Sequence, residues 1–131
     1  MEKLILTNAA WKKKLSAEAY HVLREQGTER AFTGQYHNCD EKGTYVCAAC
    51  DNPLFVSTHK FDSGTGWPSF WAPISREAVV LEEDFTLAMK LTEVTCARCD
   101  SHLGHVFADG PPPTYQRYCI NSVALNLIRD Q

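Results

Sequence analysis

Cysteines are the residues of this 131-residue chain best suited to chemistry, and four of the six form two CxxC pairs. The pairs are Cys47 with Cys50 and Cys96 with Cys99. The two sulfurs of a CxxC turn converge on one point, so two such turns supply the four thiolates of a closed tetrahedral zinc site. We therefore expect one structural zinc ion here. Because sulfur fills all four positions, none is left open for metal catalysis.

The alternatives for these pairs are a thioredoxin-like redox site and disulfide bonds. A redox site would need one CxxC in a βαβ unit, and disulfides need an oxidising compartment. The N-terminus lacks the apolar segment and cleavage site of a secretory signal, so we expect a cytoplasmic protein with reduced thiols. Both pairs share the pattern C-A-x-C-D-x-x-L, which indicates one turn design used twice, near residue 50 and near residue 97.

Cys119 stands outside both pairs, in the segment RYCINS. Side chains alternate along a strand, so Arg117, Cys119 and Asn121 are expected on one face. A guanidinium beside a thiol favours the nucleophilic thiolate and lowers the pKa of the thiol. Cys119 is therefore either a reactive nucleophile or, because cysteine is often buried, a small core residue.

Two further segments contain residue types found in active sites. His102 and His105 lie in SHLGHVF, a Gly-containing turn just after the second CxxC pair. With four cysteines satisfying the metal, these imidazoles are available for acid–base work near neutral pH, although a histidine is often only structural. Trp67 lies in FDSGTGWPSF, where two glycines and a proline constrain a loop. It is either a pocket wall or part of the core.

A helical N-terminal region precedes these segments. Asn8 is expected to cap a short helix containing Trp11, and Ser16 to cap a second helix of about ten residues that Gly27 closes. The run of three lysines after Trp11 is interpreted as a solvated face.

From Gly43 onward, short β-branched and aromatic runs separated by turn residues predict antiparallel strands. The expected ranges are 43–47, 53–57, 69–74, 78–81, 85–95, 105–108 and 117–128. In the last of these, Cys119, Asn121, Val123, Leu125 and Leu127 would share one face. Three prolines make 109–114 a stiff loop.

Composition limits the class of protein. The apolar fraction of 44% and the charged fraction of 22% are typical of a globular domain with a packed core. The net charge of −3 excludes the electrostatic footprint of a nucleic-acid-coating protein, and no apolar run approaches the roughly 20 residues of a membrane span. We expect a single domain over residues 1–131, with a helical segment over 1–30 and a β-rich, zinc-bearing core over 43–128.

The chain also carries a family likeness. The segments GTERAFTG, FDSGTGWPSF, HLGHVF and RYCINS, interleaved with the CxxC pairs, closely resemble those of the B-type methionine sulfoxide reductases. The resemblance covers nearly all of residues 8–128. It implies a mainly β fold with two small antiparallel sheets and a short helical N-terminal region. It also implies reduction of the R epimer of methionine sulfoxide, with a methionine sulfoxide within a protein as the favoured substrate.

The resemblance further implies roles for individual residues. Cys119 would be the nucleophile that becomes a sulfenic acid, with His105 or His102 as the acid, and Trp67 would hold the ε-methyl group of the substrate. The other residues expected around the substrate are Arg117, Asp109 and Asn121.

Regeneration of Cys119 departs from the commonest family pattern. Many members carry a resolving cysteine in the motif SGCGWPSF, and here that position is Thr65. Cys39 is the remaining cysteine outside the proposed zinc set, and it lies in a loop. We hypothesise that Cys39 forms a disulfide with Cys119 that thioredoxin reduces. The alternative is that Cys39 is an incidental surface thiol and Cys119 is reduced directly.

Two other functions remain alternatives. A non-catalytic, zinc-ribbon-like binding module would use Trp67 and Trp71 as a ligand cage and leave Cys119 inert. A thiol-peroxidase-like redox sensor would use a reactive Cys119 against peroxide. The preferred hypothesis is a monomeric reductase that acts on oxidised proteins and is recycled by thioredoxin.

Overall fold

The computed structural model describes residues 3–84 and 91–130, and in these ranges two helices precede nine strands. The helices are α1 (Asn8–Lys14) and α2 (Ala17–Glu25). The strands are β1 (Gly43–Cys47), β2 (Pro53–Val56), β3 (Lys60–Phe61), β4 (Ser69–Phe70), β5 (Val79–Asp84), β6 (Leu91–Cys96), β7 (His102–Phe107), β8 (Arg117–Ile120) and β9 (Leu125–Arg129). Three short 3-10 turns accompany them: η1 (Ser57–His59), η2 (Arg76–Ala78) and η3 (Ser122–Ala124).

The two helices form the N-terminal region predicted from the sequence. Ser16 caps α2 as expected, and its hydroxyl accepts a hydrogen bond from the Ala19 N–H at 3.1 Å. The prediction for α1 was one residue late, because the Thr7 hydroxyl accepts from the Ala10 N–H and Asn8 is already helical. Trp11 is fully buried. In the described residues, no helix has the length and apolar character needed to cross a membrane.

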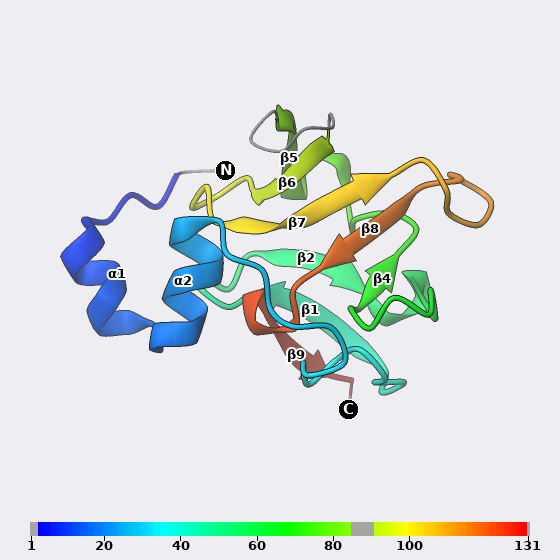
Figure 1. The fold of residues 1–131 in the computed structure, drawn as a ribbon, viewed down its shortest axis with the longest axis horizontal. Coiled ribbons are helices and arrows are strands. Elements are labelled where there is room, and N and C mark those ends of the chain that lie inside the picture. The colour runs from blue at the N-terminus through cyan, green and yellow to red at the C-terminus, as the bar shows by residue number, and fades with distance from the viewer. Residues whose placement is uncertain (1–2, 85–90, 131) are drawn as a thin grey trace.

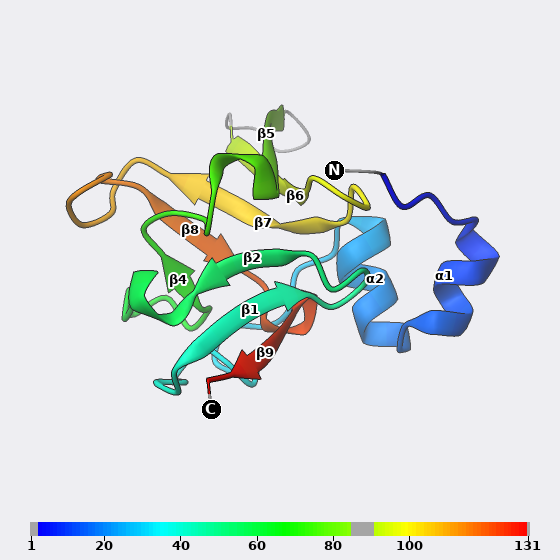
Figure 2. The same cartoon turned by 180° about the vertical axis from the view of Figure 1, so that it is seen from behind.

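The remainder folds into two antiparallel sheets, as expected. A three-stranded sheet has the order β2-β1-β9, and a six-stranded sheet has the order β3-β4-β8-β7-β6-β5. Figure 1 and Figure 2 show the two sheets as neighbouring layers, with α2 beside one end of both and α1 outside it. Helix α2 packs against β7 and η3.

Aromatic side chains fill the space between the sheets. The rings of Phe55 on β2 and Phe70 on β4 stack with their centroids 4.4 Å apart. Tyr45 on β1 meets Phe70 edge-on at 5.2 Å, and Tyr118 on β8 lies 5.9 Å from Phe55. Because these four rings come from both sheets, the core fixes the six-stranded sheet against the three-stranded one.

The prediction of one strand over 117–128 is wrong. The chain leaves the six-stranded sheet after Ile120, turns through η3, and enters the three-stranded sheet as β9. Backbone hydrogen bonds hold this turn. The Ala124 N–H donates to the Asn121 carbonyl, and the Ala48 N–H donates to the Ala124 carbonyl. Cys119 and Leu125 therefore belong to different sheets and share no common face.

Other strand bounds shift by smaller amounts. The range 43–47 is confirmed, 53–57 is one residue too long, and 69–74 is a strand only at 69–70. The range 78–81 is observed as 79–84, and residues 85–90 of the predicted strand 85–95 lie outside the described residues. The strand expected at 105–108 spans 102–107, so His102 and His105 lie on β7 and not in a turn.

Candidate functional site

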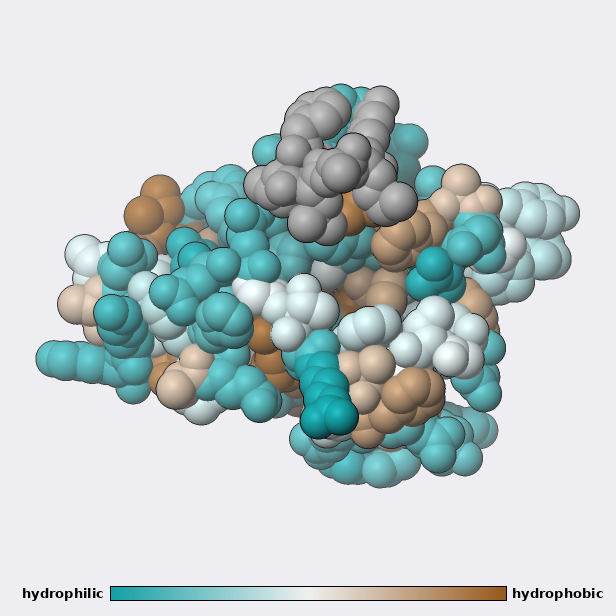
Figure 3. Space-filling model, in the orientation of Figure 1, coloured by the Kyte–Doolittle hydropathy of each residue, from teal (hydrophilic) through white to brown (hydrophobic). Residues whose placement is uncertain are grey.

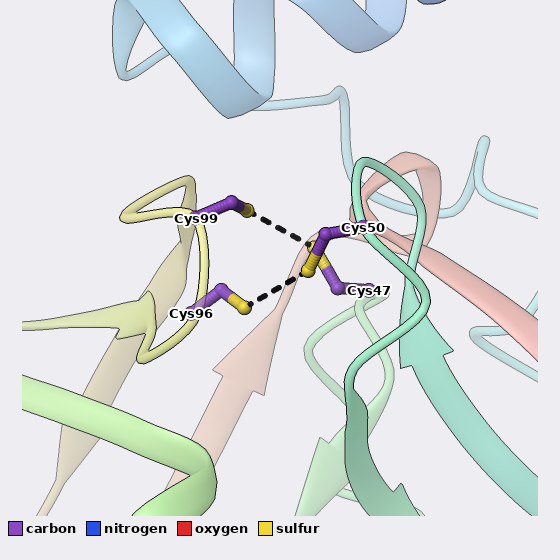
Figure 4. A group of neighbouring side chains, drawn as sticks. All are labelled: Cys47, Cys50, Cys96 and Cys99. Atoms are coloured by element: carbon purple, nitrogen blue, oxygen red, sulfur yellow. Dashed lines mark hydrogen bonds between the residues drawn. The ribbon is translucent and has the colours of Figure 1, made fainter. Parts of the chain in front are cut away.

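The four cysteines of the CxxC pairs form one buried cluster, and their sulfur atoms all lie within 4.8 Å of one another. The sulfurs of Cys47 and Cys99 are 3.7 Å apart, and those of Cys50 and Cys96 are 3.5 Å apart. Figure 4 shows the four side chains pointing toward one another from two facing turns. These separations exclude disulfides, whose sulfurs are about 2.05 Å apart. A tetrahedral ion with zinc–sulfur bonds of about 2.3 Å places its sulfurs about 3.8 Å apart, so this donor set fits one.

Both halves of the cluster use the same turn, as the repeated sequence pattern predicted. The Asp51 N–H donates to the Cys47 carbonyl at 2.8 Å, and the Asp100 N–H donates to the Cys96 carbonyl at 2.8 Å. Asp51 and Asp100 both adopt the left-handed conformation, with φ angles of 64° and 62°. Aspartate tolerates this conformation better than most residues, which gives the shared C-A-x-C-D pattern a physical basis.

Arginines tie the two turns to their surroundings. Arg24 on α2 donates to the Cys99 carbonyl at 2.7 Å, and Arg98 of the second turn donates to the Cys50 carbonyl of the first at 3.0 Å. The cluster is therefore held through its backbone as well as through its sulfurs.

Hydrogen bonding within the cluster favours the thiolate at two of the four cysteines. Bonds with Cys47 and Cys50 lower the pKa of Cys96 to about 7, and bonds with the other three cysteines lower the pKa of Cys99. The pKa values of Cys47 and Cys50 are raised. Thiolate is the form that binds a metal.

Cys119 opens onto a small pocket of about 140 Å³. Three of the residues predicted to surround the substrate share the pocket with it, namely Trp67, His105 and Asn121. The pocket is also lined by Thr28, Gly104, Phe107 and Ile120. On the face seen in Figure 3, apolar side chains gather where Figure 1 places β4 and β8, and hydrophilic ones predominate over the helices. The surroundings of Cys119 thus combine an apolar lining with a few polar groups, as in ligand sites generally.

Strand register places the polar groups in one row across the six-stranded sheet. Glu93 on β6 lies opposite His105 on β7, and His105 lies opposite Cys119 on β8. Cys119 in turn lies opposite Ser69 on β4. Directly opposite residues of antiparallel strands share a face, so the sheet itself holds an imidazole beside the thiol. Gly104 allows the close pairing of β7 and β8, because a Cβ there would lie 2.0 Å from the Cys119 carbonyl oxygen.

Glu29 positions two pocket residues, and the sequence analysis did not identify it. Its carbonyl accepts a hydrogen bond from the Trp67 indole at 3.0 Å, and its N–H donates to the Asn121 side chain at 3.0 Å. Its buried carboxylate accepts from the Val123 N–H at 2.9 Å. The available signal was an acidic residue within GTERAFTG, one of the family-like segments.

Arg117 and Asp109 form a two-bond ion pair on the strand face that carries Cys119. The Arg117 guanidinium donates to both carboxylate oxygens, at 2.9 and 3.2 Å. This hydrogen bonding lowers the pKa of Asp109. The guanidinium also lies over the Phe107 ring, 4.3 Å from its centroid. Neither Arg117 nor Asp109 lines the pocket itself.

His102 is buried and does not line the pocket. Its Nδ1 lies 2.7 Å from a Glu93 carboxylate oxygen that also accepts from the Gln26 amide at 2.8 Å. A carboxylate only accepts, so Nδ1 of His102 carries a proton. The His102 and His105 rings meet edge-on with centroids 5.3 Å apart. Of the two histidines, His105 therefore lines the pocket, and His102 contacts His105 without lining the pocket itself.

The sequence analysis expected a lowered pKa at Cys119, and this expectation is wrong in direction. Burial raises the pKa of the Cys119 thiol, and the charge of Arg117 offsets only part of that rise. A buried thiolate loses hydration, which one nearby guanidinium does not fully replace.

Cys39 lies away from this pocket. It is half-buried in the loop before β1 and lines a separate hollow of about 380 Å³ with Lys60 and Asp62, among other residues. No residue lining that hollow also lines the Cys119 pocket. The pKa of Tyr45 is raised, mainly by burial and secondly by the neighbouring Cys39. The structure thus brings Cys39 beside Tyr45 and does not bring it to Cys119.

Comparison with known proteins gives consistent similarities. Residues 15–129 match the family described as the SelR domain. A Pseudomonas syringae protein named peptide methionine sulfoxide reductase MsrB is 56% identical over 128 residues, which are 98% of this chain and 98% of the relative. Proteins of the same name from Thiobacillus denitrificans and Methanosarcina mazei are 59% and 58% identical, over 92% of this chain and 91% and 86% of their own lengths.

Replacing Arg117 with glutamine is expected to raise the pKa of Cys119 by about one unit, because the cation that favours the thiolate is lost. Below that pKa, the thiolate fraction falls about tenfold. The measurement is the pH dependence of iodoacetamide alkylation, followed by mass spectrometry of the Cys119 peptide. Arg129→Gln is the matched control, since Arg129 is exposed and pairs with Glu41. Equal alkylation profiles for both variants would refute this role of Arg117.

Proposed function

The chain belongs to the B-type methionine sulfoxide reductases, and on that premise we propose that Cys119 is the nucleophile that takes the sulfoxide oxygen. Members of this family reduce the R epimer of methionine sulfoxide to methionine. The observation that carries the assignment of Cys119 is its pocket, where the thiol, the His105 imidazole, the Trp67 ring and the Asn121 amide meet.

The proposed reaction transfers one oxygen atom. The Cys119 thiolate attacks the sulfoxide sulfur, and an imidazole protonates the oxygen. The attack forms a sulfur–sulfur bond. The hydroxyl then moves from the substrate sulfur to the Cys119 sulfur, so that the substrate sulfur–oxygen bond and the new sulfur–sulfur bond both break and methionine leaves. Cys119 is oxidised to a sulfenic acid, and the sulfoxide is reduced to a thioether. His105 is favoured over His102 as the acid because it lines the pocket and lies opposite Cys119.

The pocket size supports a substrate that is part of a protein. Pockets for drug-sized ligands typically measure about 300–1,000 Å³, whereas this pocket measures about 140 Å³. It admits the end of a methionine sulfoxide side chain and leaves the backbone outside. Trp67 then lies against the ε-methyl group, and Asn121 lies beside the sulfoxide. The Arg117–Asp109 pair lies outside the pocket lining, where it faces the part of the substrate that the pocket does not enclose.

We propose that the four-cysteine cluster binds one structural zinc ion through Cys47, Cys50, Cys96 and Cys99. The buried position and the sulfur spacing both suit a tetrahedral thiolate site. Such an ion has no open position and supplies no chemistry to the sulfoxide. Its role is to hold the turn after β1 to the turn before β7.

Cys39 is proposed as the resolving cysteine. Its thiol condenses with the Cys119 sulfenic acid to form a disulfide and one water molecule, and the two thiols of thioredoxin then reduce that disulfide. The loop between α2 and β1 contains no helix or strand, and it carries Cys39. This loop must rearrange for the two sulfurs to meet, because they occupy separate hollows.

We propose that residues 1–131 form a single reductase domain that acts as a monomer, because one chain supplies every group named. We also propose that the protein is cytoplasmic. The expected partners are oxidised proteins and thioredoxin, with no nucleic acid or membrane.

Turnover of separate R and S epimers of a blocked methionine sulfoxide, with excess dithiothreitol, tests the assignment of Cys119. The wild-type chain is expected to reduce the R epimer alone. Cys119→Ser is expected to lose about a thousandfold or more of this activity, since a serine hydroxyl is not a nucleophile at neutral pH. Full activity in a folded Cys119→Ser variant would contradict the proposal. Absence of activity on either epimer would favour the non-catalytic binding module.

Replacing Cys39 with serine is expected to separate the two reductants. With thioredoxin, turnover should fall about tenfold or more, because no disulfide forms for thioredoxin to attack. With dithiothreitol, it should stay near the wild-type rate. One turnover without reductant should consume two thiols in the wild type and leave a dimedone-reactive sulfenic acid in Cys39→Ser. A persistent sulfenic acid in the wild type would exclude the resolving role.

A further inference from the structure

Three hydroxyl groups form a hydrogen-bonded chain beside Cys119. The Ser63 hydroxyl lies 2.7 Å from the Ser69 hydroxyl and 2.8 Å from the Thr65 hydroxyl. Ser69 is completely buried, and its hydroxyl also donates to the Trp67 carbonyl at 3.2 Å. The series of hydrogen bonds thus runs from a pocket residue, Trp67, through Ser69 and Ser63 to Thr65.

The hydroxyls lie near the thiol. Ser69 lies directly opposite Cys119 in the β4–β8 pairing, so its side chain shares a face of the sheet with the nucleophile. Ser63 and Thr65 lie in the loop before β4, and Ser63 hydrogen-bonds both Ser69 and Thr65. Burial raises the pKa of Cys119, and the charge of Arg117 and then the Thr65 side chain act in the opposite direction. Figure 1 shows β4 and β8 side by side.

The loop backbone fixes this arrangement. Gly64 and Gly66 on either side of Thr65 have φ angles of 74° and 89°, which favour glycine. The Gly66 carbonyl accepts from the Phe32 N–H at 2.8 Å, and the Thr65 N–H donates to the Ser63 hydroxyl at 3.3 Å. Thr65 is therefore held at the thiol by its own loop.

The hydrogen bonds along the three hydroxyl groups can be ordered in two directions, depending on whether Cys119 is a thiol or a thiolate. A hydroxyl donates one proton and accepts through two lone pairs. With a neutral thiol, the donors run from Cys119 to Thr65, Ser63, Ser69 and finally the Trp67 carbonyl. With a thiolate, rotation of the three O–H bonds reverses the order, and the Thr65 hydroxyl donates to the sulfur. The three hydroxyl protons stay on their own oxygens in this reversal, and the proton lost from the thiol leaves through the pocket onto which Cys119 opens.

We propose that Thr65 is a positioning residue that donates a hydrogen bond to the Cys119 thiolate, and that Ser63 and Ser69 form a reversible relay behind it. This inference rests on the proposed role of Cys119 as nucleophile. It accounts for how a buried thiol ionises: hydroxyl donors replace part of the water that burial removes, and Arg117 supplies the remaining stabilisation.

Alkylation of Cys119 as a function of pH tests the proposal without any sulfoxide. Thr65→Val removes the hydroxyl and nearly keeps the volume, so the pKa of Cys119 should rise by about one unit and alkylation below that pKa should slow about tenfold. Thr65→Ser keeps the donor and should stay within about threefold of wild type. Thr58→Val is the matched control, since Thr58 is an exposed threonine in η1.

A second variant tests the relay. Ser63→Ala should raise the pKa less than Thr65→Val, and the double variant should equal Thr65→Val, because the effect of Ser63 passes through Thr65. Equal profiles for Thr65→Val and wild type, or equal shifts for Thr65→Val and Thr65→Ser, would overturn the proposal. If the wild type reduced neither sulfoxide epimer, the proposed function would fail, and the alkylation profiles would still decide whether Thr65 stabilises the thiolate.

Discussion

The four-sulfur cluster is the constraint on which the rest of the structure depends. It joins the turn that follows β1 of the three-stranded sheet to the turn that precedes β7 of the six-stranded sheet. Aromatic rings from both sheets pack against one another in the core, together with aliphatic side chains. A zinc ion bound by these four sulfurs would stabilise the folded chain by its binding free energy and would hold the two turns together. Cys99 lies shortly before β7, which carries both histidines.

From that fixed point, strand pairing builds the site. The register of β6, β7, β8 and β4 places a carboxylate, an imidazole, a thiol and a hydroxyl in one row. Glu29, from the segment after α2, then holds the tryptophan and asparagine that complete the pocket. Burial has a cost here, because it raises the pKa of Cys119. The charge of Arg117 offsets part of that rise, and the proposed hydrogen bonding by the hydroxyl groups would offset more. The pocket can then be apolar enough for a methyl group while ionisation of Cys119 costs less than burial alone would make it.

Much of this arrangement is predictable from local patterns. The CxxC pairs, their shared turn, the Ser16 cap and the two-sheet fold follow from spacing, capping chemistry and family likeness. The failures arise where tertiary contacts override a local pattern. Residues 117–128 alternate like one strand, yet η3 sends the chain into the other sheet. The pKa of Cys119 depends on how deeply the fold buries it, which neighbouring residues in sequence do not reveal. Glu29 acts mainly through its backbone, which leaves no side-chain signature, and the position of Cys39 beside Tyr45 depends on how a long loop packs.

The most direct test of this account is to remove the metal and observe the fold and the reaction in the same sample. Elemental analysis of the purified chain should find about one zinc ion per chain. After chelation under reducing conditions, the dispersed amide spectrum and turnover of the R epimer should be lost together, and both should return with added zinc. A metal-free chain that kept a dispersed spectrum and full turnover would contradict the claim that the cluster positions the site.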